Sequence, residues 1–499
     1  MPPARYLVGV PHSPSVETAE GGGIRQGGAH ALVRGMHFGV ATAGFQIEGG
    51  YNGPGEPANN WYRWESSGRV EPSGSAIGFW DRFEEQLDLV AGLGCDTFRM
   101  SVEWSRAEPE DGALDAAAFT GYRRILQACH DRHVEPLVTL HHFTHPGWLG
   151  EDFWLQPGAP ERFAQWVRAA VGELGDLCIN WVTVNEPNVL AIESFVTGTL
   201  PPGAVGRLRT AVRALDHLMT AHVLAYAAIH DLQPQATVAT NNYALSLYEL
   251  DRLPLDLLAA PLHGIDRRGL AEWLGTRREM HERISWRPAG LSRPLESALR
   301  SLASRLVPLD DGYPRTTEAV ASSGYECQLD VAQVDFYAPV AAEHFSWPGH
   351  RTAGGRSLQP ARDLWDDPPR PATLVPILAE AALPGRDVWV VENGMCNRVR
   401  RGRSYPRLDG WTRDRYLQEN LAAVVAAVDT GVPVTGYWHW TLADNYEWGS
   451  YEPRFGLYGV DRERGLRLSE LDSMGVDAAG TYRRIIGGLR QGDRSVLEQ

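Results

Sequence analysis

Short apolar runs without polar alternation recur along the chain, and each ends in polar or turn-forming residues. A run of this kind is typical of a strand buried on both faces, as in a parallel sheet. The pattern predicts eight strands, which are His37–Thr42, Cys95–Val102, Glu135–His142, Trp181–Glu186, Thr237–Asn242, Val334–Val340, Asp387–Glu392 and Val434–Thr441.

The segments between these runs carry apolar residues at steps of three and four, which is the spacing of one face of an α-helix. Such faces occupy residues 79–90, 119–129, 163–174 and 416–428. Because parallel neighbours need crossover connections, eight strands separated by helices predict a single (β/α)8 barrel, a TIM barrel of the α/β class with long loop and helical insertions. A doubly wound open sheet is the alternative. It would normally carry a glycine-rich phosphate loop after the first strand, and Ala43-Gly44-Phe45-Gln46 is not one.

The same pattern suggests one domain. Residues 1–35 show little apolar periodicity, and we expect a lead-in rather than a domain. Residues 36–490 are expected to form the barrel, because barrels with insertions can exceed about 400 residues. The stretch around 250–324 holds no strand candidate and predicts a helical insertion on the barrel. Several arginines between Arg398 and Arg407 predict a solvated loop or a lid over the substrate.

Composition and charge exclude several kinds of partner. The 499-residue chain has a formal net charge of −15, whereas nucleic acids and anionic membranes need a basic footprint. There is no apolar run of about 18 residues, and the first residues lack the apolar core of a signal peptide. We therefore expect a soluble, cytoplasmic protein without a membrane partner. Five scattered cysteines argue against a disulfide framework or a zinc site, and no ligand cluster suggests a metal or another cofactor.

Two of the predicted strands end in a glutamate. Trp181-Val182-Thr183-Val184-Asn185 runs into Glu186, and Val388-Trp389-Val390-Val391 runs into Glu392. For either stretch alone, a structural glutamate that caps the next helix is the alternative. Together they form the pair that a retaining glycosidase needs, a nucleophile and a general acid/base with carboxyl groups about 5–5.5 Å apart.

Several motifs then resemble one family in the same order along the chain. They are Phe38–Gly49, Phe98–Arg106, Thr139–Phe143, Thr183–Pro187, Asp330–Tyr337, Val391–Gly394 and Trp438–Trp448. From Met36 to about Asp461 the chain resembles glycoside hydrolase family 1, the β-glucosidase family. The resemblance implies a retaining β-glycosidase that hydrolyses a small-molecule β-glycoside without a cofactor.

The resemblance also implies roles for particular residues. Glu392 matches the nucleophile and Glu186 the acid/base, Arg99 would lie beside the nucleophile and favour its ionised form, Asn185 would donate to the sugar 2-hydroxyl, and Tyr337 would orient the nucleophile. Gln46, His142, Trp440, Glu447 and Trp448 match the residues that bind the sugar. Relatives that act on 6-phosphorylated sugars lack the glutamate at position 447, so an unphosphorylated sugar is expected.

The chain departs from the family pattern at Phe143, Thr144 and Asp335, where tryptophan, aspartate and asparagine are usual. An extra acid at position 335 could raise the pKa of neighbouring carboxyl groups. A transglycosidase with the same catalytic pair and an inactive sugar-binding barrel are alternatives. An aldolase-like barrel lacks support, because no predicted strand ends in lysine. The sequence leaves the identity of the sugar, the leaving group and a homo-oligomer open.

Overall fold

Eight parallel strands close into a barrel in the order β1-β12-β9-β6-β5-β4-β3-β2. The computed structural model describes residues 26–284, 292–309, 311–340, 351–352, 355–356, 368–400 and 403–498. The strands are β1 (His37–Ala41), β2 (Thr97–Ser101), β3 (Glu135–Thr139), β4 (Asn180–Asn185), β5 (Thr237–Leu245), β6 (Ala332–Val340), β9 (Val388–Asn393) and β12 (Val434–Trp440). The predicted barrel is confirmed, and the ends of its eight strands differ from the predicted ends by at most three residues.

The inside of the barrel is filled by side chains from strands all around it. Ala41, Leu137, Val182, Val391 and Trp438 belong to a buried apolar cluster that is separate from the main core. The Trp438 ring reaches the wall formed by β1, where Gly39 leaves room for it: a Cβ at Gly39 would lie 2.6 Å from Trp438 Cδ1. The centre of the barrel is thus a packed core, and an active site in such a barrel lies at the carboxyl ends of the strands.

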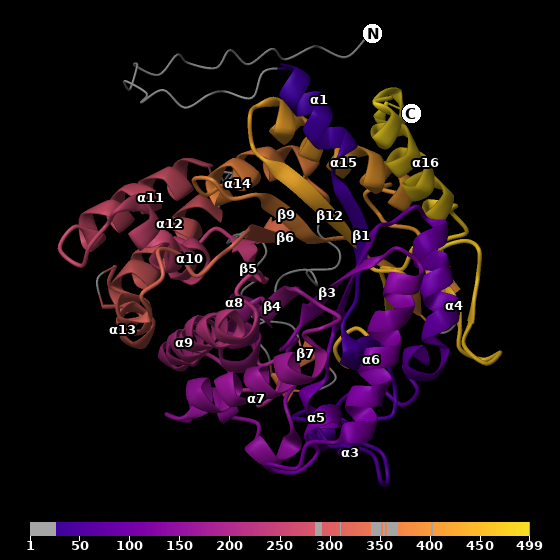
Figure 1. Ribbon diagram of the computed structural model, residues 1–499, viewed down its shortest axis with the longest axis horizontal. Coiled ribbons are helices and arrows are strands. Elements are labelled where there is room, and N and C mark those ends of the chain that lie inside the picture. Colours follow the sequence, from indigo (N-terminus) through magenta and orange to yellow (C-terminus); the bar gives the residue numbers. More distant parts are fainter. Residues whose placement is uncertain are drawn as a thin grey trace.

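Helices surround the barrel (Figure 1). The predicted helical faces are confirmed in α4 (Phe79–Gly92), α6 (Ala116–Asp131), α7 (Ala159–Leu174) and α15 (Arg413–Asp429). Each buries the apolar residues that repeat at steps of three and four. Asp115 caps α6 by accepting from the Ala117 backbone N–H at 2.7 Å. Two further helices, α9 (Leu208–Leu232) and α16 (Ala478–Gln491), also lie around the barrel.

The segment between β5 and β6 is helical. It comprises α10 (Arg252–Ala259), α11 (Leu270–Ile284), α12 (Ser292–Leu306) and α13 (Pro314–Ser323), which lie together at one side of the barrel in Figure 1. The arginine-rich stretch after β9 contains β10 (Asn397–Arg400) and β11 (Arg403–Tyr405), which pair in an antiparallel manner. Because β10 also pairs with β13 (Pro453–Arg454), this stretch, for which the sequence predicts a solvated loop or a lid, contributes two strands to a small sheet.

The remaining elements are short or lie at the ends of the chain. They are α1 (Gln26–Arg34), α2 (Gly44–Ile47), α3 (Tyr62–Ser66), α5 (Trp104–Ala107), α8 (Pro187–Ile192), α14 (Leu374–Ala381), β7 (Arg351–Thr352), β8 (Gly355–Arg356), β14 (Val460–Asp461) and β15 (Arg467–Leu468). Helix α1 lies within the expected lead-in and contacts α15 and α16. The rest of that lead-in, residues 1–25, lies outside the described residues.

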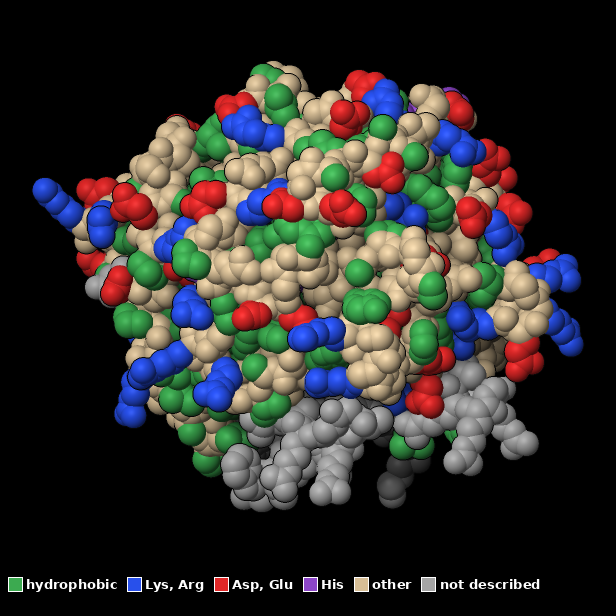
Figure 2. All heavy atoms as spheres, turned by 90° about the horizontal axis from the view of Figure 1, so that it is seen from below, with side chains coloured by type: hydrophobic (Ala, Val, Ile, Leu, Met, Phe, Trp, Pro, Cys, Tyr) green, Lys and Arg blue, Asp and Glu red, His purple; other side chains and the backbone are tan. Residues whose placement is uncertain are grey.

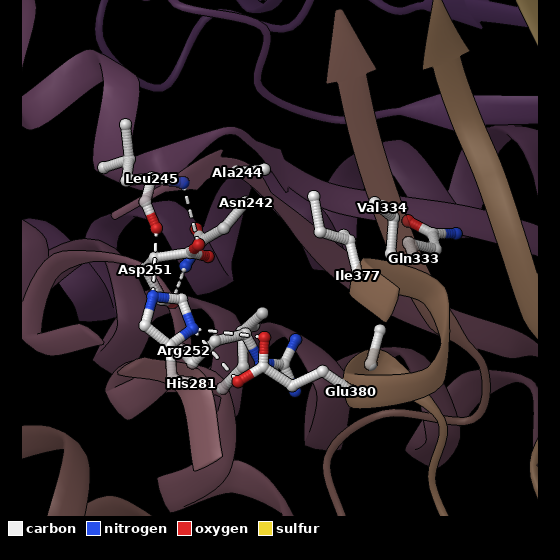
Figure 3. A pocket seen from close by; sticks show the side chains of 12 residues that line it. Asn242, Ala244, Leu245, Asp251, Arg252, His281, Gln333, Val334, Ile377 and Glu380 are labelled. Atoms are coloured by element: carbon white, nitrogen blue, oxygen red, sulfur yellow. Dashed lines mark hydrogen bonds and ion pairs between the residues drawn. The ribbon is translucent and has the colours of Figure 1, made fainter. Parts of the chain in front are cut away.

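A cavity lies outside the barrel wall and is lined by residues from β5, β6, α10, α11 and α14 (Figure 3). His281 contacts the Glu380 carboxylate at 3.0 Å through Nδ1 and the Leu245 carbonyl oxygen at 3.1 Å through Nε2. Burial lowers the pKa of His281, but the hydrogen bond and the charge of Glu380 outweigh burial and raise it. A protonated His281 therefore connects α11 to α14 and to β5, which is a structural role.

The surface mixes charges of both signs. Figure 2 shows basic and acidic side chains interspersed over the face that it presents, without a large basic area. No helix within the described ranges is both long and apolar enough to cross a lipid bilayer.

Candidate active site

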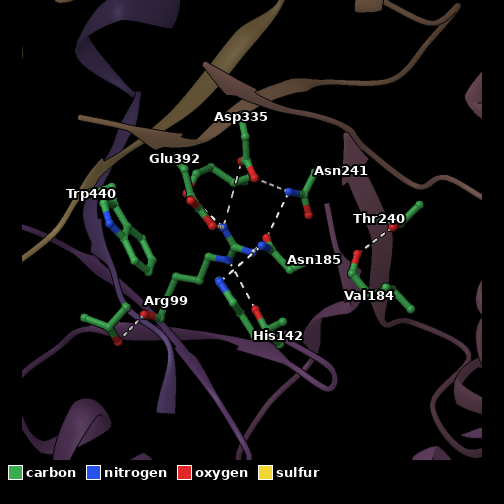
Figure 4. A network of polar contacts seen from close by, with 12 residues as sticks. Arg99, His142, Val184, Asn185, Thr240, Asn241, Asp335, Glu392 and Trp440 are labelled. Atoms are coloured by element: carbon green, nitrogen blue, oxygen red, sulfur yellow. Dashed lines mark hydrogen bonds and ion pairs between the residues drawn. The ribbon is translucent and has the colours of Figure 1, made fainter. Parts of the chain in front are cut away.

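Polar side chains gather where the barrel strands end, because the carboxyl ends of parallel strands meet at one rim. Arg99 is on β2, Asn185 on β4, Asn241 on β5, Asp335 on β6 and Glu392 on β9 (Figure 4). Tyr337 is also on β6. Gln46, His142, Glu186, Glu447 and Trp448 follow the ends of β1, β3, β4 and β12, and Trp440 is the last residue of β12. The site residues thus come from six strands and from the segments that follow β1, β3, β4 and β12.

Both oxygens of the Glu392 carboxylate accept a hydrogen bond. Arg99 Nη1 donates to Oε1 at 2.7 Å, and the Tyr337 hydroxyl donates to Oε2 at 2.8 Å. Arg99 is 0% exposed, and its Nε donates to Thr139 Oγ1 at 3.2 Å, which fixes the guanidinium. Burial raises the pKa of Glu392, while Arg99 and Tyr337 oppose that rise by stabilising the carboxylate. Glu392 is therefore the carboxyl group in this cluster with the best support for a negative charge.

Glu186 lies one residue beyond β4, directly before Pro187, the first residue of α8. Glu186, Asp335 and Glu392 each present an oxygen atom, and these three atoms lie within 4.8 Å of one another. Burial raises the pKa of Glu186 well above its ordinary value, and the charges of Asp335 and Glu392 raise it further. The two glutamates thus differ: burial and neighbouring negative charges favour the protonated form of Glu186, whereas the Arg99 guanidinium favours the ionised form of Glu392.

Two asparagines extend the network around Arg99 (Figure 4). Arg99 Nη2 donates to Asn185 Oδ1, and Asn241 Nδ2 donates both to that oxygen, at 3.0 Å, and to Asp335 Oδ2. Asn185 Nδ2 in turn lies 3.2 Å from His142 Nε2. Burial lowers the pKa of His142 well below its ordinary value, with a further contribution from Arg99, so the neutral ring accepts at Nε2.

A second polar group lies around Glu447. Its Oε2 accepts from Gln46 Nε2 at 2.9 Å, and its Oε1 accepts from Trp440 Nε1 at 3.2 Å. Burial raises the pKa of Glu447 to about 8. The His142 ring stacks against both Trp440 and Trp448, with ring centroids 5.7 Å apart in each pair. The two groups therefore meet at His142, and all ten candidate residues belong to one connected arrangement.

Five buried polar atoms in this arrangement have no hydrogen-bond partner within the described part of the chain. They are Gln46 Oε1, His142 Nδ1, Glu186 Oε1, Asn241 Oδ1 and Asp335 Oδ1. Buried polar atoms are normally paired, and an unpaired one costs about 1–3 kcal/mol. A ligand with several hydroxyl groups could pair them.

Unusual backbone geometry accompanies the site. Phe143, Glu186 and Trp448 have φ values of 66°, 37° and 42°, in the left-handed region that non-glycine residues rarely adopt. Such conformations persist where the surroundings over-determine them, as they often do at functional sites.

Phe143 and Thr144, which follow β3, are two of the positions where the chain departs from the usual motif. The Phe143 ring packs on the Trp448 ring with centroids 4.8 Å apart, and the Thr144 hydroxyl donates to Glu103 Oε2 at 2.6 Å.

Asn241 is the site residue that sequence reasoning missed. It links Asn185 to Asp335 through a single amide group. The signal was present, because Asn241-Asn242 ends an apolar run in the same way that Asn185-Glu186 does. The predicted strand ended at Asn242, whereas β5 continues to Leu245, so the asparagine was read as the end of a strand rather than as part of the rim.

Comparisons with known proteins agree with this arrangement. The family model described as "Glycosyl hydrolase family 1" matches residues 30–262 and 372–472. The chain belongs to glycosyl hydrolase family 1. It is therefore an O-glycosyl hydrolase, a β-glycosidase of this family.

Curated members of family 1 are similar over almost the whole chain. The "6-phospho-beta-galactosidase 1" of Streptococcus pneumoniae is 27% identical over 89% of this chain and 97% of its own length. The "Beta-glucosidase" of Agrobacterium sp. is 26% identical over 92% of this chain and 96% of its own. The solved β-glucosidase of Thermotoga maritima in complex with azafagomine has a TM-score of 0.67 at 22% identity, over 91% of this chain and 98% of that one. This last similarity supports the barrel fold.

Proposed function

We propose that this protein is a retaining β-glycosidase that hydrolyses unphosphorylated β-glycosides. The observation that carries the proposal is the spacing of Glu186 and Glu392, whose carboxyl oxygens approach within 4.8 Å. Retaining enzymes hold their two carboxyl groups about 5–5.5 Å apart, whereas inverting enzymes need about 6.5–9.5 Å to admit a water molecule. An oxygen of each group within 4.8 Å of the other supports the shorter separation of a retaining enzyme.

The environments of the two glutamates support distinct roles. Glu392, ionised beside Arg99 and oriented by Tyr337, attacks the anomeric carbon and forms a glycosyl ester. Glu186 gives its proton to the leaving oxygen as the glycosidic bond breaks, and it then takes a proton from the water that hydrolyses the ester. In this scheme Asn185, held by Arg99, donates to the sugar 2-hydroxyl through its amide group.

The sugar would occupy the space between the two polar groups. The unpartnered Gln46 Oε1 and His142 Nδ1 supply an acceptor and a donor for hydroxyl groups. The face of Trp440 suits the C–H face of a pyranose ring, and Glu447 with Trp448 would contact the outer hydroxyls.

The surroundings of Glu447 support an unphosphorylated sugar. Its carboxyl group accepts from Gln46 and Trp440, which are both neutral, and nearby Glu392 and Asp444 carry charge of the sign that raises its pKa. A sugar 6-phosphate would bring up to two negative charges into this acidic, buried region, and phosphate sites normally offer arginine, lysine or backbone N–H groups instead. In this proposal the substrate of the chain therefore differs from that of the relatives named 6-phospho-beta-galactosidase, because its sugar carries no phosphate.

The state of the cysteines is relevant to the cellular compartment in which the protein works. All five cysteines are buried and unpaired, which supports a reducing, cytoplasmic setting.

The test is release of nitrophenol from aryl β-glucoside, β-galactoside and β-fucoside, with the matching 6-phosphates in parallel. Glu392→Gly should lose turnover, and added azide or formate should restore part of it by taking the place of the nucleophile. Glu108→Gly removes another buried glutamate, one that pairs with Arg162 away from the catalytic cluster, and its rate should not respond to azide. Turnover of the 6-phosphates alone would refute the unphosphorylated sugar. A folded protein that is silent on every sugar would refute the hydrolase as proposed.

A further inference from the structure

Three carboxyl groups share one guanidinium at the centre of this site. Glu186, Asp335 and Glu392 are 6%, 0% and 3% exposed, and their oxygen atoms lie within 4.8 Å of one another. Arg99 is fully buried beside them and makes its close ion pair with Glu392, at 2.7 Å, while its distance to Asp335 is 3.9 Å. If all three acids were ionised, the cluster would carry two uncompensated negative charges in a desolvated position. At least one proton must therefore stay on Glu186 or Asp335.

The contacts of Asp335 indicate which of the two holds that proton. The Asp335 carboxyl group faces that of Glu186, with an oxygen of each within 4.8 Å. Their interaction raises the pKa of Glu186 and lowers that of Asp335, although burial and the Glu392 charge still hold the pKa of Asp335 well above its ordinary value. Asn241 Nδ2 donates to Asp335 Oδ2, and this hydrogen bond stabilises a negative charge on Asp335. Among the described residues, Glu186 Oε1 and Asp335 Oδ1 both lack a hydrogen-bond partner, so the amide donor at Oδ2 is what distinguishes Asp335. The ionised form is thus better supported at Asp335 and the protonated form at Glu186.

We propose that Asp335 is a positioning residue that shares one proton with Glu186 and keeps the acid/base carboxyl group protonated in the free enzyme. The inference rests on the proposed function, in which Glu186 is the acid/base. It adds a third carboxyl group to the catalytic pair at a position where the resemblance leads one to expect an asparagine.

The proton balance of the reaction is consistent with this role. In the free enzyme, Arg99 is positive, Glu392 and Asp335 are negative and Glu186 is neutral, so the cluster carries one net negative charge. When Glu392 becomes a neutral ester, the proton of Glu186 leaves with the alcohol, and Glu186 and Asp335 are then negative beside Arg99. The net charge is again minus one. Asp335 therefore makes Glu186 a more persistent acid in the first step and a stronger base toward water in the second.

Other titratable groups also face Glu186 and set the background against which Asp335 acts. Burial and the Asp335 charge raise the pKa of Glu186, the Glu392 charge raises it further, and the Arg99 charge lowers it. The charged or titratable side chains that interact with this carboxyl group are Asp335 and Tyr337 from β6, Glu392 from β9 and Arg99 from β2. Tyr337 keeps its proton, so Asp335 and Glu392 are the two negative charges that oppose ionisation of Glu186.

Asp335→Asn is the decisive variant, because an amide has the same shape and can keep the hydrogen bond with Asn241 while it loses the charge. We expect the basic limb of kcat/KM against pH to move toward lower pH by at least about one unit, measured with an aryl glycoside that has a poor leaving group. Asp330→Asn is the matched control. It removes a carboxyl group just before β6, at the opposite end of the barrel, where Asp330 accepts from the Val238 backbone N–H at 2.9 Å. Its basic limb should coincide with that of the unchanged protein.

A second substrate separates this role from simple structural damage. A dinitrophenyl glycoside leaves without help from an acid, so its glycosylation rate should differ little between Asp335→Asn and the unchanged protein at pH values above the basic limb. A basic limb of Asp335→Asn within about 0.3 unit of the parent would overturn the proposal. An equal loss of rate on both substrates with an unmoved limb would also overturn it. Failure of the proposed function looks different, since the unchanged protein would then turn over neither substrate.

Discussion

Replacing Tyr337 with phenylalanine removes the hydroxyl that donates to Glu392 Oε2 at 2.8 Å and leaves the ring in place. That hydroxyl stabilises the ionised nucleophile and lowers its pKa against the effect of burial. The variant should therefore have a nucleophile with a higher pKa. Glu392 would then become protonated, and inactive, at a higher pH than in the unchanged protein, so the acidic limb of kcat/KM should move upward.

The size of this shift follows from the kind of bond that is lost. A hydrogen bond to a charged group contributes about 1.5–3 kcal/mol, and one pKa unit corresponds to about 1.36 kcal/mol. The acidic limb should move by about 1–2 units. At a pH below the limb, kcat/KM should fall by about 10–100-fold, while the loss near the top of the profile should be smaller because Arg99 still pairs with Glu392.

Tyr243→Phe is the matched control for this experiment. The Tyr243 ring stacks on Tyr337 with centroids 5.8 Å apart, but its hydroxyl donates to the Ala338 carbonyl oxygen rather than to Glu392. The assay is the pH profile of aryl glycoside hydrolysis for the parent and both variants. An acidic limb of Tyr337→Phe that coincides with the parent's, or an equal shift in Tyr243→Phe, would refute the reasoning.

Three further predictions concern the sugar site and the structure beneath it. Glu447→Gln should lower kcat/KM for the preferred sugar by about tenfold or more, since it removes an acceptor of hydroxyl groups; an equal rate would contradict the role of Glu447. Gly394→Ala should lower the unfolding temperature and the activity, because its Cβ would overlap the Trp440 carbonyl oxygen, and calorimetry with the aryl glycoside assay checks both. Arg413→Met should lower the free energy of unfolding in urea by about 3–5 kcal/mol, because it leaves Asp472 buried and unpaired; a loss below about 1 kcal/mol would contradict this account.

Much of the architecture could be predicted because its signals are local. A strand covered on both faces must be apolar throughout, so runs such as Val388–Val391 are visible in the sequence alone. Asn393-Gly394 after one such run and Pro187 after another mark where the strands stop, which is why the positions of Glu392 and Glu186 at the rim were predictable. The small sheet formed by β10, β11 and β13 was not, because its pairing joins segments far apart in the chain and arginines give no strand signal.

The part of the site that escaped prediction depends on three-dimensional contacts. The link from Asn185 through Asn241 to Asp335 is visible only when β4, β5 and β6 are placed side by side. The left-handed backbone at Glu186 likewise has no sequence signal, because glutamate does not favour that conformation. Asp335 was predictable in one respect and not in another. Its identity stood out in the sequence, but its place beside Glu186 and Glu392 required the structure.

The most direct test of the account is to identify the carboxyl group that becomes bonded to the sugar. A glycoside with fluorine at the 2-position and a good leaving group should form a glycosyl ester that hydrolyses slowly, and mass spectrometry of the digested protein would locate it. The account predicts one added sugar on the peptide that contains Glu392, released again on transfer to water or an added alcohol. A label on Glu186 or Asp335, or active enzyme that accumulates no label and inverts the anomeric centre, would contradict it.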